Sequence, residues 1–379
     1  MSDSIPLQYH QNAEGIRSVD PRRSTIKRSP VMTLVEFPHQ PSEDKIVVVQ
    51  HGEATEFLDV AYPTLRLHES SANILLAHAL ARAPVETVLT ECQFIDDTDV
   101  QFLPSPTQPF RSNNFWLTVW SQRAKSPPVL DLALSCLESS SSKYPVFIWT
   151  PAKMGMQSPQ WLDPRVRAMA AYLQVCVDHE RVFAAFGPSM LVTTFADVWA
   201  GLTGFQINPQ PLYKAFSAVC TPQDIKVTAT AEQCGARKAT IHDLDAAARL
   251  CQEFASSSEY PLDLPDATAE ARQLIDKGQL WVGTLMGEIE SICAVARSSL
   301  HVSAITKVFT TPDARRNGLA QTLVKEVTSR LFKSGKHSVM LYVGCDNQAQ
   351  RVYDRVGFQI QHADIWLELG FVGTNPGHW

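Results

Sequence analysis

The alternation of hydrophobic and polar positions is most regular in the C-terminal half of the chain. Apolar side chains at Leu319, Leu323, Val327 and Leu331 recur every four residues, which predicts an amphipathic helix over 318–332. Short apolar runs predict strands near 237–241, 280–286, 291–298, 302–310, 338–343 and 359–369. Further helices are expected near 244–256, 267–277 and 347–355. These elements predict a mixed sheet flanked by helices, an α/β or α+β architecture.

The N-terminal half contains a weaker copy of the same pattern. The tetrapeptide "GFQI" occurs at 204–207 and again at 357–360, each time after a strand-like run and a helix-like segment. Upstream, a strand ending in Thr-Pro and then a helical pattern stand at 144–178, and the same order recurs at 303–332. Two strand–helix–strand–helix units about 150 residues apart predict a duplicated fold. The alternative is a chance likeness between two unrelated α/β domains.

A polar stretch separates the two copies. Residues 221–236, "TPQDIKVTATAEQCGA", have little core patterning and predict a boundary, which we place at about 225. We therefore expect an N-terminal domain over 31–225 and a C-terminal domain over 226–379. Residues 1–30 are polar and rich in arginine and lysine, and we expect a disordered tail there. A transit peptide is the alternative, although the acidic residues in this segment count against it.

Composition narrows the classes of function. The formal charge of −6 gives no general reason to expect nucleic-acid binding, and no apolar run approaches membrane-spanning length. The eight cysteines are scattered without a C-x-x-C pair, which argues against a zinc site and against a compact disulfide framework. We expect no metal site, and a soluble cytoplasmic protein with reduced thiols.

The segment before the amphipathic helix carries candidate chemistry. "TTPDARRNGLA" (310–320) follows a predicted strand and places Arg315, Arg316 and Gly318 at the start of the helix. Unpaired N–H groups and the positive end of the helix dipole make such a helix start suitable for an anion. The spacing Arg-x-x-Gly-x-Ala is compatible with a pyrophosphate site, and equally with a solvated basic turn. It matches neither the phosphate-binding loop of nucleotide hydrolases nor the dinucleotide fingerprint.

On these residues the sequence resembles the GNAT acyltransferase superfamily. That family carries Q/R-x-x-G-x-G/A between its fourth strand and the next helix, as Arg315 to Ala320 do here. A second family element, a strand, an asparagine, a helix with tyrosine and then Gly-Phe, appears as "LYVGCDNQAQRVYDRVGF" with Asn347, Tyr353, Gly357 and Phe358. The resemblance covers roughly 237–369. It extends more weakly to the N-terminal half, and so implies two GNAT-like domains, each with a mixed, mostly antiparallel sheet flanked by helices.

The resemblance implies acetyl-CoA or another acyl-CoA as co-substrate. The diphosphate would lie on the backbone of Arg316, Asn317, Gly318, Leu319 and Ala320, beside Arg315. Pantetheine would follow the strand edge at Val308, Phe309 and Thr310, with Asn347 and Gln350 on its other side. A strand N–H near Val308 would stabilise the developing oxyanion.

Catalytic roles are less well defined than coenzyme contacts. The family tyrosine falls at Tyr353, which the resemblance implies as the proton donor to the leaving thiolate, although a half-buried aromatic residue is the alternative. A general base is expected near the fourth strand, and His301, Asp346 and Glu368 are candidates, each also compatible with a surface or structural role. Cys293 and Cys345 are interpreted as small core residues, because direct transfer needs no nucleophile.

The N-terminal half lacks both family elements. "KMGMQSPQWLDPRVRAMAAYL" contains no R-x-x-G-x-A, and Trp199 stands where the second copy has Tyr353. We expect a degenerate, non-catalytic repeat that completes the sheet packing and forms a wall of the acceptor site. Phe115, Trp116 and Trp120 in "NFWLTVW" are expected in a strand core, or at the acceptor pocket.

The leading hypothesis is an N-acyltransferase, most simply an acetyltransferase, moving an acyl group to a small amine by direct attack. The alternatives are O-acyl transfer, decarboxylation or another reaction of the thioester without amine transfer, and a non-catalytic acyl-CoA-binding protein. The expected partner is a small-molecule amine or metabolite, with neither nucleic acid nor membrane. The acceptor, the acyl chain length and the oligomeric state are left open.

Overall fold

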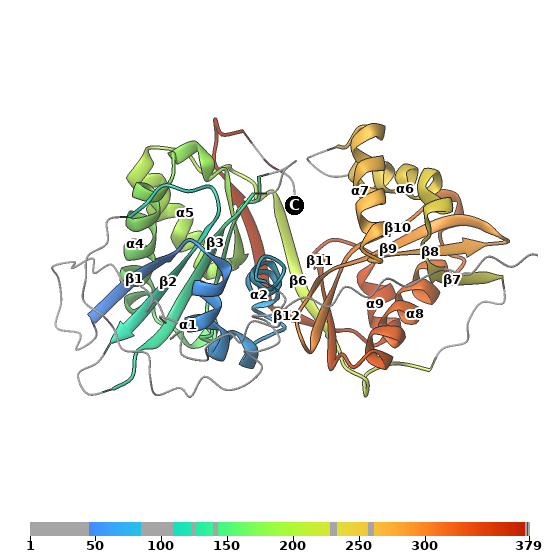
Figure 1. Cartoon of the computed structure of the whole chain (residues 1–379), viewed down its shortest axis with the longest axis horizontal. Helices are drawn as coiled ribbons and strands as arrows, with labels where there is room; N and C mark the ends of the chain where they lie inside the picture. The colour runs from blue at the N-terminus through green and yellow to red at the C-terminus, as the bar shows by residue number, and fades with distance from the viewer. Residues whose placement is uncertain are drawn as a thin grey trace, which may run out of the picture.

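The computed structural model describes residues 45–84, 109–122, 126–138, 143–227, 233–256, 261–375 and 377 (Figure 1). The expected N-terminal tail, 1–30, lies outside them. In the N-terminal half the elements are β1 (Lys45–His51), α1 (Ala54–Leu67), α2 (Asn73–Leu80), β2 (Phe115–Gln122), β3 (Val129–Cys136), β4 (Val146–Trp149), α4 (Pro159–Cys176), β5 (Ala184–Pro188), α5 (Ser189–Thr203) and β6 (Tyr213–Cys220). In the C-terminal half they are β7 (Cys234–Lys238), α6 (Leu244–Ser256), α7 (Leu264–Asp276), β8 (Leu280–Leu285), β9 (Glu288–Ser298), β10 (Val302–Thr310), α8 (Leu319–Lys333), β11 (Ser338–Gly344), α9 (Gln350–Val356) and β12 (Gln359–Gly370).

The strands of the described chain form one sheet that runs through both halves. Its order is β1-β2-β3-β4-β5-β12-β6-β11-β10-β9-β8-β7. Neighbouring strands pair antiparallel except β4 with β5 and β10 with β11. The expectation of two mixed, mostly antiparallel units is therefore confirmed, and so is the repeated order, since β4-α4-β5-α5-β6 in the first half matches β10-α8-β11-α9-β12 in the second.

The last strand of each repeat pairs with the other repeat. β6 ends the first repeat but lies beside β11 of the second, with Gly344 opposite Ala215 and Val339 opposite Cys220. β12 ends the second repeat but lies beside β5 of the first, with Trp366 opposite Pro188. β6 and β12 also pair with each other. This exchange of strands is what makes a single sheet out of two repeats (Figure 1).

The two faces of the sheet carry different helices. Along β12, Trp366 packs with the cluster under α1 and α2, whereas Leu367 packs with the cluster under α4 and α5. Along β11, Tyr342 packs with the α1/α2 cluster and Val343 with the cluster under α8. Side chains alternate between faces, so α1, α2, α6 and α7 cover one face and α4, α5, α8 and α9 the other. We call the first the α2 face.

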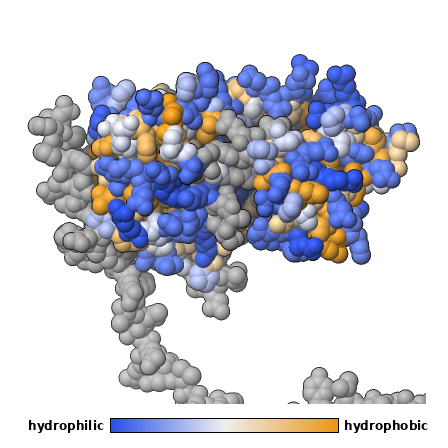
Figure 2. Space-filling model, turned by 90° about the horizontal axis from the view of Figure 1, so that it is seen from above, coloured by the Kyte–Doolittle hydropathy of each residue, from blue (hydrophilic) through white to orange (hydrophobic). Residues whose placement is uncertain are grey.

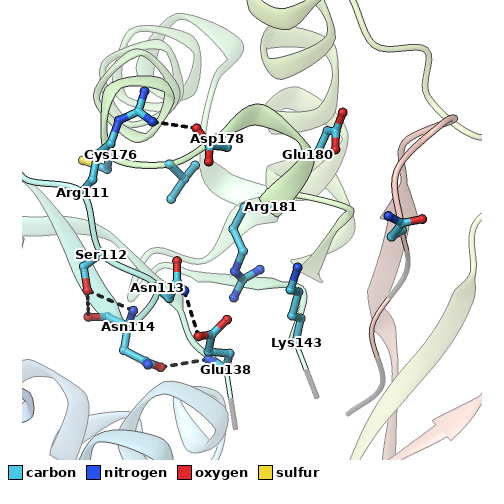
Figure 3. A pocket seen from close by; sticks show the side chains of 12 residues that line it. Arg111, Ser112, Asn113, Asn114, Glu138, Lys143, Cys176, Asp178, Glu180 and Arg181 are labelled. Carbon is cyan, nitrogen blue, oxygen red and sulfur yellow. Dashed lines mark hydrogen bonds and ion pairs between the residues drawn. The ribbon is translucent and has the colours of Figure 1, made fainter. Parts of the chain in front are cut away.

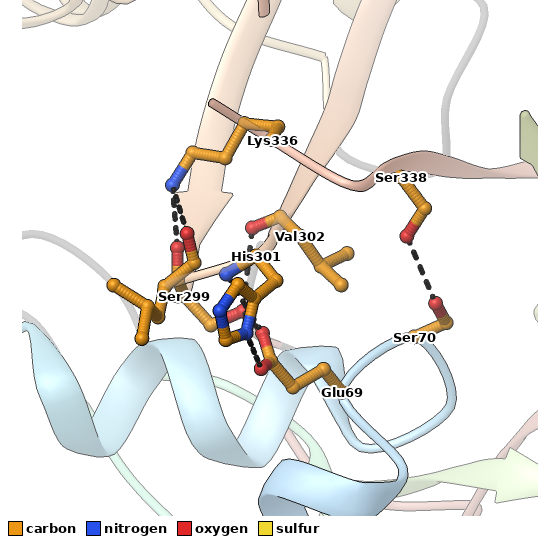
Figure 4. A network of polar contacts seen from close by, with 8 residues as sticks. Glu69, Ser70, Ser299, His301, Val302, Lys336 and Ser338 are labelled. Carbon is orange, nitrogen blue, oxygen red and sulfur yellow. Dashed lines mark hydrogen bonds and ion pairs between the residues drawn. The ribbon is translucent and has the colours of Figure 1, made fainter. Parts of the chain in front are cut away.

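Helix α2 also reaches the C-terminal half, because α2 packs against β9 and β10. The loop before α2 is held there by Glu69 (Figure 4). Its carboxylate accepts hydrogen bonds from Ser299 Oγ at 2.5 Å and His301 N at 3.1 Å, and lies 2.7 Å from His301 Nδ1. Lys336 Nζ donates to Ser299 O at 2.5 Å, and Ser70 Oγ lies 3.3 Å from Ser338 Oγ. A polar clamp thus joins the two halves at the start of β10.

Most elements predicted for the C-terminal half are present within a few residues of their expected bounds. Both ends of β7 lie three residues before their predicted places, α7 and β9 begin three residues early, and α9 begins three residues late, after a turn. The expected core strand of the N-terminal half is β2, in which Phe115, Trp116 and Trp120 are buried. The sequence did not predict β6, whose buried positions are irregularly spaced. The predicted boundary stretch holds the connection from β6 to β7.

The recurring glycine of "GFQI" ends a helix in both halves. Gly204 follows α5 with φ of 79°, and Gly357 follows α9 with φ of 125°, values that L side chains rarely adopt. At Gly357 the chain is also crowded, since an added Cβ would lie 2.1 Å from Asp224 O. Lys226 N donates to Val356 O at 3.0 Å, so the segment after β6 is bound directly against the end of α9.

Gly357→Ala is expected to lower the free energy of unfolding by about 2–4 kcal/mol, through backbone strain and the contact with Asp224 O. Gly201→Ala is the control, because it lies inside α5 and an added Cβ would meet nothing within 4 Å. That variant should be about 0.5–1 kcal/mol more stable than the parent. Urea unfolding measures both changes, and a Gly357→Ala midpoint equal to the parent's would contradict the crowded turn.

Glu69→Gln should lower the free energy of unfolding at pH 7 by about 1–3 kcal/mol, because a charged acceptor is replaced by a neutral one. Burial opposes ionisation of Glu69, but hydrogen bonds from Ser299 and His301 outweigh it and lower the pKa of the carboxyl. A lowered folded-state pKa means that the stabilisation is complete above the unfolded value of about 4.3 and is lost as the pH falls through the folded value.

The measurement is urea unfolding of both proteins from pH 7 downward. The difference between them should be constant to about pH 5 and shrink at lower pH. Asp59→Asn, which changes an exposed acid on the nearby helix α1, should stay within about 0.5 kcal/mol of the parent. A Glu69→Gln difference no larger than that of the control would show that the clamp adds no stability.

Candidate functional site

Strands β10 and β11 separate in the middle of the sheet. Their parallel pairing runs from Val302–Ser338 to Ile305–Leu341 and then stops, although both strands continue. On the other side of β10, the register with β9 shifts twice between Ala304 and Lys307. Bulges increase local twist, which turns β10 away from β11. The edge of β10 that carries Val308, Phe309 and Thr310 is therefore not paired with β11, and we call this unpaired stretch between the two strands the opening.

The loop that follows β10 has an unusual backbone. After a short 3-10 turn (Pro312–Ala314), Arg316 has φ of 69° and Gly318 has φ of 80°. Left-handed residues alternating with Asn317 turn successive N–H groups to one side, a geometry that suits an anion. A left-handed arginine costs about 1 kcal/mol or more, and such strain concentrates at functional sites.

The start of α8 adds unpaired donors to this loop. Gly318 is the N-cap and no side chain caps the helix. The first α-helical bond runs from Thr322 N to Gly318 O at 2.9 Å, so the N–H groups of the first turn have no acceptor within the helix. Arg315, Arg316, Asn317 and Gly318 are exposed, and Leu319 anchors the turn in the core. The result is an accessible, positively charged arrangement of donors.

Hydrogen bonds fix this loop to the end of β10. Arg315 Nε donates to Thr310 O at 3.1 Å, and its guanidinium carbon lies 5.8 Å from the centre of the Phe309 ring. Ser291 Oγ donates to Phe309 O at 2.7 Å and lies 2.8 Å from Thr310 Oγ1. Asn317 Nδ2 donates back to Ala314 O at 3.3 Å. The loop is therefore held in place before any ligand arrives.

Tyr353 reaches the same opening from the α8 side of the sheet. It is 8% exposed and packs in one cluster with Cys293, Val343 and the partly buried Val308. Burial raises the pKa of Tyr353, and Cys293 and Tyr213 add to the effect, so the phenol keeps its proton at neutral pH. The structure thus brings Tyr353 and Val308 together. Cys293 is fully buried as expected, whereas Cys345 is half-buried in the turn after β11.

The turn between β11 and α9 contains the other residues singled out from the sequence. Asn347 Oδ1 accepts from Ala349 N at 2.9 Å, which leaves the Asn347 amide nitrogen at the exposed surface. Gln350 Nε2 donates to Gly344 O at 2.9 Å and Cys345 O at 2.7 Å, so its amide braces the end of β11. Asp346 is exposed in this turn.

The remaining base candidates lie elsewhere. His301 precedes β10 at the end opposite the loop, about 13 Å along the strand from Ile305, and its ring is engaged with Glu69. The structure does not bring His301 together with Tyr353 or the loop. Glu368 is 4% exposed on β12, opposite Tyr213 of β6 and Phe186 of β5, and belongs to the α2 face.

The equivalent place in the N-terminal half is closed. Helix α4 is capped by Ser158 Oγ, which accepts from Trp161 N, and Pro159 removes one donor from the first turn. Beyond the last pair, Phe147–Phe186, the strands stay close, since a Cβ on Gly187 would lie 2.3 Å from Ile148 O. In the described residues, the end of β4 therefore has fewer free helix donors and no separation of strands like that after Ile305.

Sequence reasoning missed a second group of polar residues, on the α2 face. Arg297 of β9 is 8% exposed, and its guanidinium carbon lies 5.7 Å from the ring centre of Tyr342 on β11. Lys307 Nζ lies 2.6 Å from Glu270 Oε2 of α7. The sequence signal that could have revealed this group is a charged residue inside an otherwise apolar strand, as Arg297 is in "ICAVARS".

A polar pocket of ≈ 720 Å³ lies in the N-terminal half (Figure 3), and none of the predicted site residues lines it. Arg181 projects there beside Lys143 and donates to Tyr144 O at 3.0 Å and Leu137 O at 2.6 Å, so it braces loops.

On the face in Figure 2, hydrophobic residues form small groups among hydrophilic ones. Across the described ranges, no group of three metal-ligating side chains could hold an ion. No helix placed by the structure has the length and hydropathy to cross a membrane.

Comparison with known proteins gives one family match and several similar folds. Residues 281–367 match the FR47-like protein family. No curated protein sequence matches the chain. Among solved structures, similar folds include a Drosophila protein (TM-score 0.50, 13% identity, covering 85% of this chain and 96% of that chain). They also include a GCN5-related N-acetyltransferase from Sphaerobacter thermophilus (0.46, 14%, 90% and 98%) and a tandem GNAT protein from the clavulanic acid biosynthesis pathway (0.44, 11%, 87% and 100%).

At such identities, likeness to solved structures speaks for the fold alone. The FR47-like match covers β8 through most of β12, the segment that contains the opened strands, the loop and Tyr353. The order of elements occurs twice along the chain, and the N-terminal copy has fewer free helix donors. Residues 281–367 are therefore similar to the FR47-like family, and the chain has a duplicated fold whose N-terminal copy lacks the opening.

Proposed function

We propose that the protein is an acyl-CoA-dependent N-acyltransferase whose coenzyme site lies in the C-terminal half. One observation carries the proposal. The opening between β10 and β11 leads directly to a loop of left-handed residues and to the uncapped start of α8. A slot for an extended chain, followed by backbone donors for an anion, suits a pantetheine arm joined to a diphosphate.

In this proposal the diphosphate accepts hydrogen bonds from the N–H groups of residues 316–320. The exposed side chains of Arg315 and Arg316 add positive charge. The pantetheine arm follows the free edge of β10 from Thr310 to Val308, and the amide nitrogen of Asn347 faces it from the turn after β11. Gln350 acts indirectly, by holding the end of β11. Acetyl-CoA is the simplest acyl-CoA for this site.

The chemistry follows from these positions. A neutral amine attacks the thioester carbonyl, and a strand N–H near Val308 donates to the developing oxyanion. The carbon–sulfur bond then breaks, and Tyr353 gives its proton to the leaving thiolate. For removal of the amine's proton we retain Glu368, because it lies on the α2 face, opposite Tyr353. His301 is left out of the mechanism because Glu69 engages it at the far end of β10.

Thiol release separates this function from its alternatives. An N-acyltransferase releases free coenzyme A from acetyl-CoA only when an amine is supplied. An enzyme that consumes the thioester alone would release thiol without the amine, and a binding protein would release none in either case. The buried, protonated Tyr353 beside the opening favours turnover over binding alone.

Gly318→Asp compared with Gly318→Asn tests the anion site. Both side chains tolerate the left-handed backbone and both suit a helix N-cap, so the two variants should fold alike. They differ by one negative charge placed where the diphosphate belongs. The aspartate variant should bind coenzyme A at least about 100-fold more weakly than the asparagine variant by calorimetry, and more weakly still at low salt. Equal affinities would place the diphosphate elsewhere.

Tyr353→Phe tests the proton donor. The ring packing is preserved and only the hydroxyl is removed, so coenzyme affinity should change less than twofold. The turnover number should fall by about 10²–10⁴, the usual contribution of general acid catalysis. Tyr172→Phe, a tyrosine buried in α4 of the other half, serves as the control and should keep full activity. A Tyr353→Phe enzyme as active as the parent removes the tyrosine from the mechanism.

A further inference from the structure

The α2 face carries a buried cluster of polar and aromatic side chains next to the proposed acyl site. Its centre is the Arg297 guanidinium over the Tyr342 ring. Tyr342 also lies 4.9 Å from Trp366 and 5.4 Å from Phe186, measured between ring centres. Phe186 in turn stacks on Tyr213 at 6.4 Å. These residues come from β5, β6, β9, β11 and β12, so the strand exchange assembles the cluster.

The cluster lies where the two strands begin to separate. Tyr342 directly follows Leu341, the last residue of β11 that pairs with β10. Arg297 on β9 pairs with Ala304, which directly precedes Ile305, the last residue of β10 that pairs with β11. Tyr342 and Arg297 therefore lie on the α2 face close to the end of the opening, which is where the thioester of the proposed coenzyme would be placed.

Solvent reaches the sheet at this point. The register shifts between β9 and β10 leave Ala296 and Thr306 outside the ladder, and both residues are exposed although their strands lie well inside the sheet. Helix α2 packs on β9 and β10 on one side of them, and α6 packs on the same strands on the other. A second substrate can therefore approach the end of the opening from the α2 face.

Several polar atoms in this region are buried without a hydrogen-bond partner in the part of the chain that the structure describes. They include the Tyr342 hydroxyl, both amide atoms of Asn73 and Nδ1 of His78. Burial lowers the pKa of His78 to about 3, with Arg297 and Arg82 adding to it, so this imidazole is neutral and brings no second charge. Buried donors without acceptors are costly unless a ligand meets them.

The set of donors suits one kind of anion. Arg297 supplies a single positive charge in a planar fork, and the Tyr342 hydroxyl supplies one neutral donor beside it. A guanidinium fork matches the two oxygens of a carboxylate. Another cation of the α2 face, Lys307, lies 2.6 Å from Glu270 Oε2. The aromatic rings around Tyr342 leave a compact, partly apolar surrounding, which suits a small acid better than a polyanion.

We propose that Arg297 and Tyr342 bind a carboxylate of the acceptor, so that the acceptor is an amino acid or another small amine that carries an acidic group. This inference rests on the proposed function. Held by its carboxylate, such an acceptor directs its amine toward the end of the opening between β10 and β11. The two residues are binding groups, and no bond changes at either of them.

The test is thiol release from acetyl-CoA with free amino acids, each compared with its own carboxamide, and with simple alkylamines. The parent enzyme should use at least one amino acid with kcat/KM about 100-fold or more above the matching carboxamide. Arg297→Gln should reduce that preference below about tenfold, mainly through KM. Arg297→Lys, which keeps the charge and loses the fork, should restore part of it.

Tyr342→Phe is a second test, which remains valid if the Arg297 variants fail to fold, because it removes only a hydroxyl. It should raise KM for the amino acid about three- to tenfold and leave KM for acetyl-CoA within twofold. Tyr62→Phe on α1 is the control and should match the parent.

Preferential use of carboxamides or alkylamines by the parent would overturn the inference and leave the proposed transferase intact. An undiminished preference in Arg297→Gln would overturn it as well. Acetyl-CoA binding with no thiol release in any of the three sets would instead refute the transfer to amines itself.

Discussion

The pairing of β6 with β11 and of β12 with β5 is the constraint on which the remaining structure depends. Each repeat gives its last strand to the other, so the backbone groups at the edge of β11 are satisfied by β6, a strand from the other half of the chain. β12 then lies between β5 and β6 and closes the sheet. Gly357 and the segment after β6 hold the end of α9 against this junction. A separate C-terminal half would expose the free edge of β11, a row of unpaired donors and acceptors.

Within this common sheet, the equivalent strand pairs β4–β5 and β10–β11 have different structures at their ends. In both, the central parallel pair is short and a helix follows the first of its strands. In the C-terminal repeat the strands diverge, and the following helix begins at an uncapped glycine. In the N-terminal repeat Gly187 lets β5 lie against Ile148 O, while the Ser158 side chain accepts from one helix donor and Pro159 lacks another. The difference is local, a few residues at one end of one strand, and under the proposed function it would decide which half can hold an anionic carrier.

Local sequence patterns predicted most of these elements. The features that depend on pairing between distant strands were not predicted. The four-residue repeat of Leu319, Leu323 and Val327 specifies α8 within one residue, because a helix satisfies its own backbone. The Arg-x-x-Gly spacing located the loop, although the left-handed Arg316 is visible only in the structure. β6 was missed because its core-facing positions depend on strands about 120 and 150 residues away. The same limit applies to Arg297 and Tyr342, since each looks like an isolated polar residue in a strand until β9 and β11 are placed in one sheet. His301 was proposed from its nearness to β10 in sequence, and its engagement with Glu69 depends on a loop 232 residues away.

The exchange of strands also explains why a repeat without its own anion site would be retained. Direct transfer needs two reactants to meet at one carbonyl from different directions. In the proposed transfer, the carrier would occupy the end of the opening that faces α8, and Tyr353 lies on the α8 side of the sheet. The acceptor would then come from the α2 face, where α2, Phe186 and Tyr213 all belong to the N-terminal repeat. The clamp at Glu69 fixes the loop before α2 to the start of β10, and so ties this wall of the proposed acceptor site to the C-terminal half. Under the proposed function, the N-terminal repeat would help to select the amine, and the C-terminal repeat would carry out the transfer.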